Sequence, residues 1–183
     1  MIPLFYEFIL YSFLGFLLEV LYARLLGRGR HGRKCLLFLP LCPVYGIGAL
    51  AILHMPPLLQ AHPAAIFIAG GLLATLVEYA VGATYLWGVG IRFWDYSRSP
   101  GNLSGLICPL YTLYWGLLAV MLVQRIHPAL APLFSQVPAE LALLLFPLFA
   151  ADGLISLWLL HRAGDPDSLM WYRAFQQSQE GTM

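Results

Sequence analysis

The sequence predicts an all-α, polytopic membrane protein of about five transmembrane helices, arranged as two pseudo-symmetric two-helix units plus a fifth helix. Three observations lead to this prediction: the apolar composition, the distribution of basic residues and a repeated tetrapeptide. Hydrophobic residues make up 60% of the 183 residues and charged residues only 10%, and the mean hydropathy is +0.75. Because soluble globular chains carry about 25% charged residues, the composition excludes an ordinary soluble domain.

The apolar runs are long enough to cross a bilayer, which takes about 20 residues. We expect spans at residues 2–22, 36–53, 64–87, 106–123 and 139–160. The second span has the weakest pattern, since Pro40 and Pro43 interrupt it. Residues 1–162 therefore form the predicted transmembrane domain, and residues 163–183 form a tail.

Basic residues give the orientation of the spans. Nine of the ten lysines and arginines follow the first, third and fifth spans. Only Arg125 falls in the predicted loop between the fourth and fifth spans. Cationic loops stay cytoplasmic, so we expect the N-terminus outside and the tail inside the cell.

A tetrapeptide occurs twice, as Cys42-Pro43-Val44-Tyr45 and as Cys108-Pro109-Leu110-Tyr111. Each copy opens an apolar run and follows another run that carries one carboxylate, Glu19 or Glu78. This pattern predicts a duplicated two-helix element, with unit A at residues 1–61 and unit B at residues 62–125. The fifth helix, 139–160, stands outside the repeat. Such duplication tends to place a functional site at the axis between the repeats.

Proline suits the first position of a helix because it lacks an N–H group, so Cys42 and Cys108 are candidate N-caps. In that case residues 35–41 and 103–107 enter the membrane region as irregular chain, and the two helix N-termini would suit an anionic group. A continuous helix kinked by proline is the alternative. A thiol site for redox chemistry or a soft metal is another, although no C-x-x-C or Cys/His spacing accompanies it.

Three carboxylates, Glu19, Glu78 and Asp152, lie within apolar spans. An ionised carboxylate there costs roughly 2.5–3.5 kcal/mol, so each must be protonated, face a wet cavity, bind a cation or meet an arginine from a loop. Glu78 shares a face with Gly71 and Gly82, where another helix can approach closely. Hydrogen bonding of protonated acids to nearby tyrosines, with a purely structural role, remains the alternative.

The segment Trp94-Asp95-Tyr96-Ser97 leads through Pro100-Gly101-Asn102-Leu103-Ser104-Gly105 to the second Cys-Pro pair. Its residues are typical of interfaces and tight turns, and they also suit a ligand-binding loop or a docking surface. The candidate binding or pathway residues are Glu19, Tyr22, Cys42, Tyr45, Glu78, Tyr79, Asp95, Tyr96, Asn102, Cys108 and Tyr111.

The sequence contains no motif for several other kinds of chemistry. The chain lacks a Walker P-loop, H-E-x-x-H and G-x-S-x-G, and its histidines form no ligand pattern. We therefore expect no cofactor, no metal and no ATP hydrolysis by the chain itself, and we expect membrane lipids rather than nucleic acid as partners. The tail opens with Asp165-Pro166-Asp167-Ser168, a helix N-cap followed by proline, which predicts a short interfacial helix or a loosely ordered tail.

Several of these residues together resemble a known family. They are Tyr11-Ser12-Phe13-Leu14-Gly15 with Glu19, Pro40 with Cys42-Pro43-Val44-Tyr45-Gly46, Glu78-Tyr79, Trp94-Asp95-Tyr96-Ser97, Asn102, Gly105 and Trp115-Gly116. In this combination the chain resembles the bacterial family of membrane proteins called Putative ABC-transporter type IV, over roughly residues 5–120. The resemblance implies a permease subunit in the bacterial cytoplasmic membrane and a separate cytoplasmic ATPase as partner.

Three functions remain open from the sequence. The first is a small permease subunit that forms a homo-oligomer, because five spans are few for a complete pathway. The second is an intramembrane enzyme or lipid-binding protein that acts near the cytoplasmic leaflet, with its acids tuned for proton transfer. The third is a structural or regulatory membrane protein. We expect a non-enzyme before an enzyme.

Overall fold

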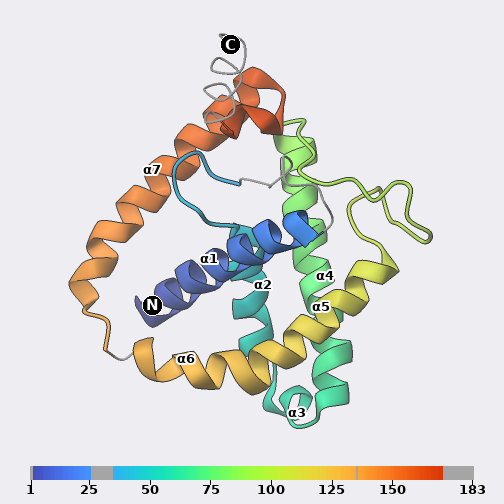
Figure 1. Ribbon diagram of the computed structural model, residues 1–183, viewed down its shortest axis with the longest axis vertical. Helices are drawn as coiled ribbons and strands as arrows, with labels where there is room; N and C mark the ends of the chain where they lie inside the picture. The colour runs from blue at the N-terminus through green and yellow to red at the C-terminus, as the bar shows by residue number, and fades with distance from the viewer. Residues whose placement is uncertain (1, 26–34, 135, 171–183) are drawn as a thin grey trace.

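Four long apolar helices dominate the computed structural model, which describes residues 2–25, 35–134 and 136–170 (Figure 1). The segments Ile2–Leu25, Pro63–Gly88, Pro109–Phe134 and Ala139–Ala163 are long and apolar enough to cross a membrane. A shorter apolar helix covers Pro43–Leu53. All regular elements within the described residues are helices, so the predicted all-α class is confirmed and about five membrane helices are compatible with the structure.

The second predicted span, 36–53, is only partly helical, which corrects the sequence expectation. Residues 35–42 are bent, non-helical chain, and helix α2 begins at Pro43 and ends at Leu53. Cys42 is its N-cap in extended conformation, with Pro43 at the first helical position. A helix of 11 residues rises about 16 Å, roughly half the thickness of a bilayer core. The short helix α3, Pro57–Gln60, follows after Pro56.

The fourth predicted span, 106–123, also differs in its bounds. Helix α5 begins at Pro109, again after a cysteine N-cap, and ends at Met121. A π-helical turn, η1, Leu122–Ile126, joins it directly to α6, His127–Phe134. Arg125 therefore lies within a helix, and its placement in a loop was wrong. The wider turn precedes Pro128, whose ring would meet the carbonyl of Gln124 in a regular helix.

The helices pack in two sequential pairs. Helix α1, Ile2–Leu25, packs against α2, and α4, Pro63–Gly88, packs against α5, while α2 and α4 join the pairs. The central core draws on all four helices and consists of Tyr11, Ala49, Ile52, Met55, Ile66, Ala74, Ala119 and Leu122. The two elements of each predicted unit are thus direct neighbours.

Helix α7, Ala139–Ala163, lies along one side of the molecule (Figure 1). It meets α1 through two edge-to-face ring pairs, Phe5 with Phe146 and Phe8 with Phe149. After α7 the predicted cap is present, because the Asp165 carboxylate accepts the Asp167 N–H at 2.8 Å. It opens a short 3₁₀ helix, η2, Pro166–Leu169. The rest of the predicted interfacial helix falls outside the described residues.

One face of α4 is exposed although it is apolar. Ile68, Leu72 and Leu76 recur at a spacing of four residues and are 61%, 60% and 62% exposed. The opposite face carries Glu78 and is buried. Because water would disfavour so regular an apolar stripe, these residues suit contact with lipid. The helix thus presents an apolar face outward and its carboxylate inward.

Candidate functional site

Glu78 is held between two neutral hydrogen-bond donors from different parts of the chain. Its side chain is 5% exposed. The Tyr96 hydroxyl donates to Oε1 at 3.0 Å, and the Trp115 indole Nε1–H donates to Oε2 at 3.0 Å. Gly71, about two turns earlier on α4, lets α5 approach, since a Cβ there would lie 3.1 Å from the Thr112 carbonyl oxygen.

The loop between α4 and α5, residues 89–108, carries Tyr96 to this carboxylate. The Trp94 indole Nε1–H donates to the Leu106 carbonyl at 2.8 Å, and the Tyr96 N–H donates to the Gly105 carbonyl at 2.8 Å. Gly105 has φ +70°, a left-handed conformation that favours glycine. The loop is therefore braced by its own backbone and by one buried indole.

Asp95 and Asn102 belong to the framework of this loop. The Asp95 carboxylate accepts the Ser97 N–H at 2.9 Å, and this hydrogen bond holds the pKa of Asp95 below its ordinary value. The Asn102 side-chain amide donates to the carbonyls of Ser97 and Ser99, and its oxygen accepts the Gly105 N–H. Both residues support the turn that positions Tyr96.

Glu19 receives its hydrogen bond from the first tetrapeptide. The Tyr45 hydroxyl donates to Glu19 Oε1 at 2.8 Å. Gly15, one turn before Glu19 on α1, makes room for this tyrosine, because a Cβ at that position would lie 2.2 Å from Tyr45 Cγ. The Tyr45 ring also lies 5.1 Å, centroid to centroid, from the Trp115 ring that holds Glu78. The surroundings of Glu19 and Glu78 are therefore in contact through the Tyr45 and Trp115 rings.

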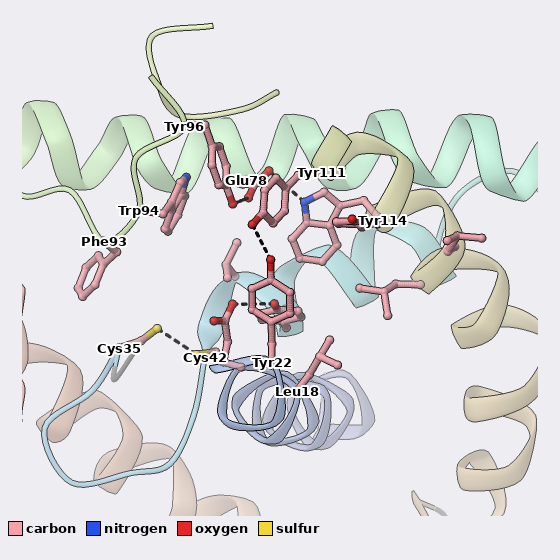
Figure 2. Close-up of a pocket in the computed structure, with 16 residues that line it drawn as sticks. Leu18, Tyr22, Cys35, Cys42, Glu78, Phe93, Trp94, Tyr96, Tyr111 and Tyr114 are labelled. Carbon is pink, nitrogen blue, oxygen red and sulfur yellow. Dashed lines mark hydrogen bonds between the residues drawn. The ribbon is translucent and has the colours of Figure 1, made fainter. Parts of the chain in front are cut away.

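Both carboxylates line one cavity of about 330 Å³ between the two helix pairs (Figure 2). The hydroxyls of Tyr22 and Tyr111 meet at 3.0 Å between α1 and α5, and the Tyr111 ring stacks on Tyr96 at 4.3 Å. Seven residues of the predicted set line the cavity: Glu19, Tyr22, Cys42, Tyr45, Glu78, Tyr96 and Tyr111.

The other four predicted residues lie elsewhere. Asp95 and Asn102 brace the loop, as described above. Tyr79 points its ring at Trp87, with the centroids 6.4 Å apart. Cys108 is buried in a small cluster with Trp94 and Tyr96. Aromatic lining residues that the prediction missed include Phe93, Trp94, Tyr114 and Trp115. The interfacial Trp-Asp-Tyr-Ser pattern was the available signal for Trp94.

The cysteines are arranged differently from the symmetric thiol pair considered above. The Cys42 thiol lies 3.0 Å from the thiol of Cys35, both at the edge of the cavity. Among the described residues, no group of three or more His, Cys, Asp or Glu side chains could hold a metal ion. Cys42 and Cys108 share a role as helix N-caps, and neither forms a side-chain cap hydrogen bond.

Asp152, on α7, holds the bent chain that precedes α2. Its carboxylate accepts the backbone N–H groups of Leu37, Phe38 and Leu39 at 2.7–3.1 Å. It also accepts the hydroxyl of Ser156 at 3.2 Å and is 4% exposed. Three N–H groups on one carboxylate satisfy a stretch that has no helix or sheet partner. The sequence showed an acid in an apolar span but gave no sign of this partner.

Comparison with known proteins gives one family. The model of the family described as Putative ABC-transporter type IV matches residues 6–157. This range contains most of α1, all of α2 to α6, most of α7 and both carboxylates that line the cavity. No curated protein and no solved structure matches the chain.

Proposed function

Since the chain belongs to the Putative ABC-transporter type IV family, we propose that it is the membrane-spanning permease subunit of a transporter driven by a separate ATPase. It lies in the bacterial cytoplasmic membrane with its N-terminus outside and its C-terminus inside. Two copies complete the pathway, because about five membrane helices per chain are few.

The observation that carries this proposal is the single cavity that Glu19 and Glu78 share. In transporters built from repeats, substrate sites lie at the interface of the repeats near the middle of the membrane. Here α1 and α2 supply one wall and α4, α5 and the loop 89–108 the other. The volume of about 330 Å³ falls at the lower end of ligand pockets, which supports a small substrate.

The loop 89–108 is the proposed contact for the ATPase. It is firmly braced, and it exposes Arg92 and Asp95, which lie 3.8 Å apart, on the side where α4 ends. The end of α7 packs near the same place, through Leu160 and Ile91, so Arg162 follows on this side as well. Basic residues gathered on one side of the molecule support the proposal that this side faces the cytoplasm.

The test is purification of the full-length tagged chain from its native membrane, followed by an ATPase assay. We expect a stoichiometric partner that hydrolyses ATP and that dissociates when the loop is altered by Arg92→Glu with Asp95→Lys. Arg125→Glu, in η1 between α5 and α6, serves as the control and should retain the partner. Substrate uptake into liposomes that contain the purified chain alone, without nucleotide, would exclude the ATPase-driven mechanism.

A further inference from the structure

Two of the three cysteines lie side by side where two cavities meet. The thiol of Cys35 lies 3.0 Å from that of Cys42, although six residues separate them in the sequence (Figure 2). Both residues line the cavity described above. Cys35 also lines a second, apolar cavity of about 480 Å³, whose walls come mainly from α2 and α4. The bent chain 35–42 thus turns back until the side chains at its two ends meet.

The two thiols differ in their access to a reagent. Cys35 is partly exposed, whereas Cys42 is buried and only 1% exposed. Because Cys35 borders both cavities, a small molecule that enters either of them can reach its sulfur. An external reagent would therefore meet Cys35 first, and Cys42 would react through its neighbour.

The distance between the two sulfurs suits a reaction between them. Reacting atoms about 3–3.5 Å apart are already in a near-attack arrangement, and these sulfurs lie 3.0 Å apart. Cys42 is also the N-cap of α2, and the partial positive charge of a helix N-terminus stabilises a thiolate. The pair thus combines an accessible thiol with a buried thiol that is placed to attack it.

A metal site would need more ligands than this pair supplies. Structural zinc takes four protein ligands. Within residues 2–25, 35–134 and 136–170, no third His, Cys, Asp or Glu side chain joins the two thiols in a group that could hold a metal ion. Cys108, the remaining cysteine, is buried in the cluster with Trp94 and Tyr96. The arrangement of Cys35 and Cys42 therefore favours sulfur exchange over metal binding.

We propose that Cys35 and Cys42 form a thiol–disulfide exchange site for a low-molecular-weight disulfide, of which glutathione disulfide is an example. The site goes beyond the proposed function, because it needs neither a transported substrate nor an ATPase. The proposed orientation places residues 35–42 towards the cytoplasm, where disulfides are transient and commonly sense the redox state. The pair would then report that state at the border of both cavities.

The exchange has two steps, and they balance without another oxidant. The Cys35 thiolate attacks one sulfur of the small disulfide, so that a mixed disulfide forms and the bond between the two sulfurs of the reagent breaks. The first small thiol leaves with the proton of Cys35. The Cys42 thiolate then attacks the Cys35 sulfur, and the second small thiol leaves with the proton of Cys42. Two protein thiols are oxidised to one disulfide, while the reagent is reduced to two thiols.

The disulfide would join the two ends of a segment that is already held at its middle. Asp152 accepts the N–H groups of Phe38 and Leu39 within this segment. Helix α2 begins directly after Cys42. Oxidation would therefore fix the start of α2 to the bent chain that precedes it, and reduction would release this link.

The experiment incubates the purified full-length chain in nanodiscs with glutathione disulfide. The remaining thiols are then labelled with maleimide under denaturing conditions, and the disulfide is located by mass spectrometry. We expect a Cys35–Cys42 disulfide that reduced glutathione reverses, with Cys108 as the labelled thiol. Cys42→Ser should stop at a glutathione adduct on Cys35. In Cys35→Ser, the buried Cys42 should acquire glutathione at least about tenfold more slowly.

Cys108→Ser is the matched control, because it also replaces a buried cysteine that caps a helix. It should form the disulfide as fast as the unchanged chain does. Absence of a Cys35–Cys42 disulfide in the unchanged chain, or a glutathione adduct that persists there, would overturn the proposal. Equal rates at Cys35 and Cys42 in the two single variants would do the same. Since the main measurement uses the unchanged chain, it holds even where Cys42→Ser does not fold.

Discussion

The α1–α2 pair, predicted unit A, and the α4–α5 pair, predicted unit B, begin alike and end differently. In each, a long helix carries the acid, and a second helix starts at the proline of a Cys-Pro-x-Tyr sequence. In unit A, the tyrosine of this sequence, Tyr45, donates to the acid. In unit B, the equivalent Tyr111 bonds Tyr22 instead, and Tyr96 and Trp115 hold Glu78.

The difference lies in the chain before each Cys-Pro pair. The loop 89–108 of unit B braces itself and delivers Tyr96 to the acid. Residues 35–42 of unit A are held from outside, by Asp152 of α7. The tetrapeptide thus determines where a helix starts, and the preceding segment determines which residue holds the acid.

The largest expected effect comes from removing the external brace. Asp152→Ala leaves the N–H groups of Phe38 and Leu39 without their acceptor, whereas the Leu37 N–H keeps the Ser156 hydroxyl at 2.8 Å. The change should lower the free energy of unfolding by about 3 kcal/mol. It should also open the approach to Cys42, which is 1% exposed, while Cys108 stays protected. Maleimide labelling and SDS-induced unfolding measure both effects. Equal labelling of Cys42 and Cys108 would contradict the difference between the two segments that precede the Cys-Pro pairs.

Asp152 also marks the limit of what the sequence predicts. Apolar runs predict helices because the membrane imposes them, and Pro43 and Pro109 predict helix starts because proline lacks an N–H. Neither signal identifies a hydrogen-bond partner in a segment that is distant along the chain. The hydrogen bonds from Leu37, Phe38 and Leu39 to Asp152 depend on tertiary packing, so no local sequence pattern predicts them.

The cavity residues show the same difference between what the local sequence predicts and what tertiary packing decides. Small residues such as Gly71 predicted the inward face of Glu78. The donors from Tyr96 and Trp115 come from a loop and from another helix, and periodicity carries no information about them. The continuous α5–α6 helix was missed because Arg125 and two prolines resemble a loop, whereas a π-helical turn accommodates Pro128.

The second prediction compares the two acids. Glu78→Ala should cost about 2–3 kcal/mol of unfolding free energy, because it leaves the Tyr96 hydroxyl and the Trp115 indole without their acceptor in a buried place. Glu19→Ala should cost about 1 kcal/mol, since Glu19 is half-buried and accepts the Tyr45 hydroxyl. Glu140→Ala is the control. A larger cost for Glu19 would contradict the contrast between the two units.

The third prediction concerns the two helix crossings. A Cβ added at Gly46, on α2, would lie 2.6 Å from the Phe8 carbonyl oxygen, whereas one at Gly71, on α4, would lie 3.1 Å from that of Thr112. Gly46→Ala should therefore destabilise the protein by about 2–3 kcal/mol and Gly71→Ala by about 1 kcal/mol. Thermal unfolding in detergent measures both. Gly88→Ala, with nothing within 4 Å, controls for the change in helix propensity.

The smallest effect should come from the titration of Asp95, and it should be confined to predicted unit B. The Ser97 N–H holds the pKa of Asp95 below its ordinary value, so the ionised carboxylate stabilises the loop. This contribution is fully present above the unfolded pKa of about 3.9 and is lost as pH falls through the lower pKa of the folded state. Hydrogen exchange at Ser97 should speed up across that window, and Asp95→Asn should abolish the pH dependence. Residues 35–42 are held by Asp152 and not by Asp95, so their exchange should be the same in Asp95→Asn as in the unchanged chain throughout that window. A change there on Asp95→Asn would mean that the loop and the segment held by Asp152 open together.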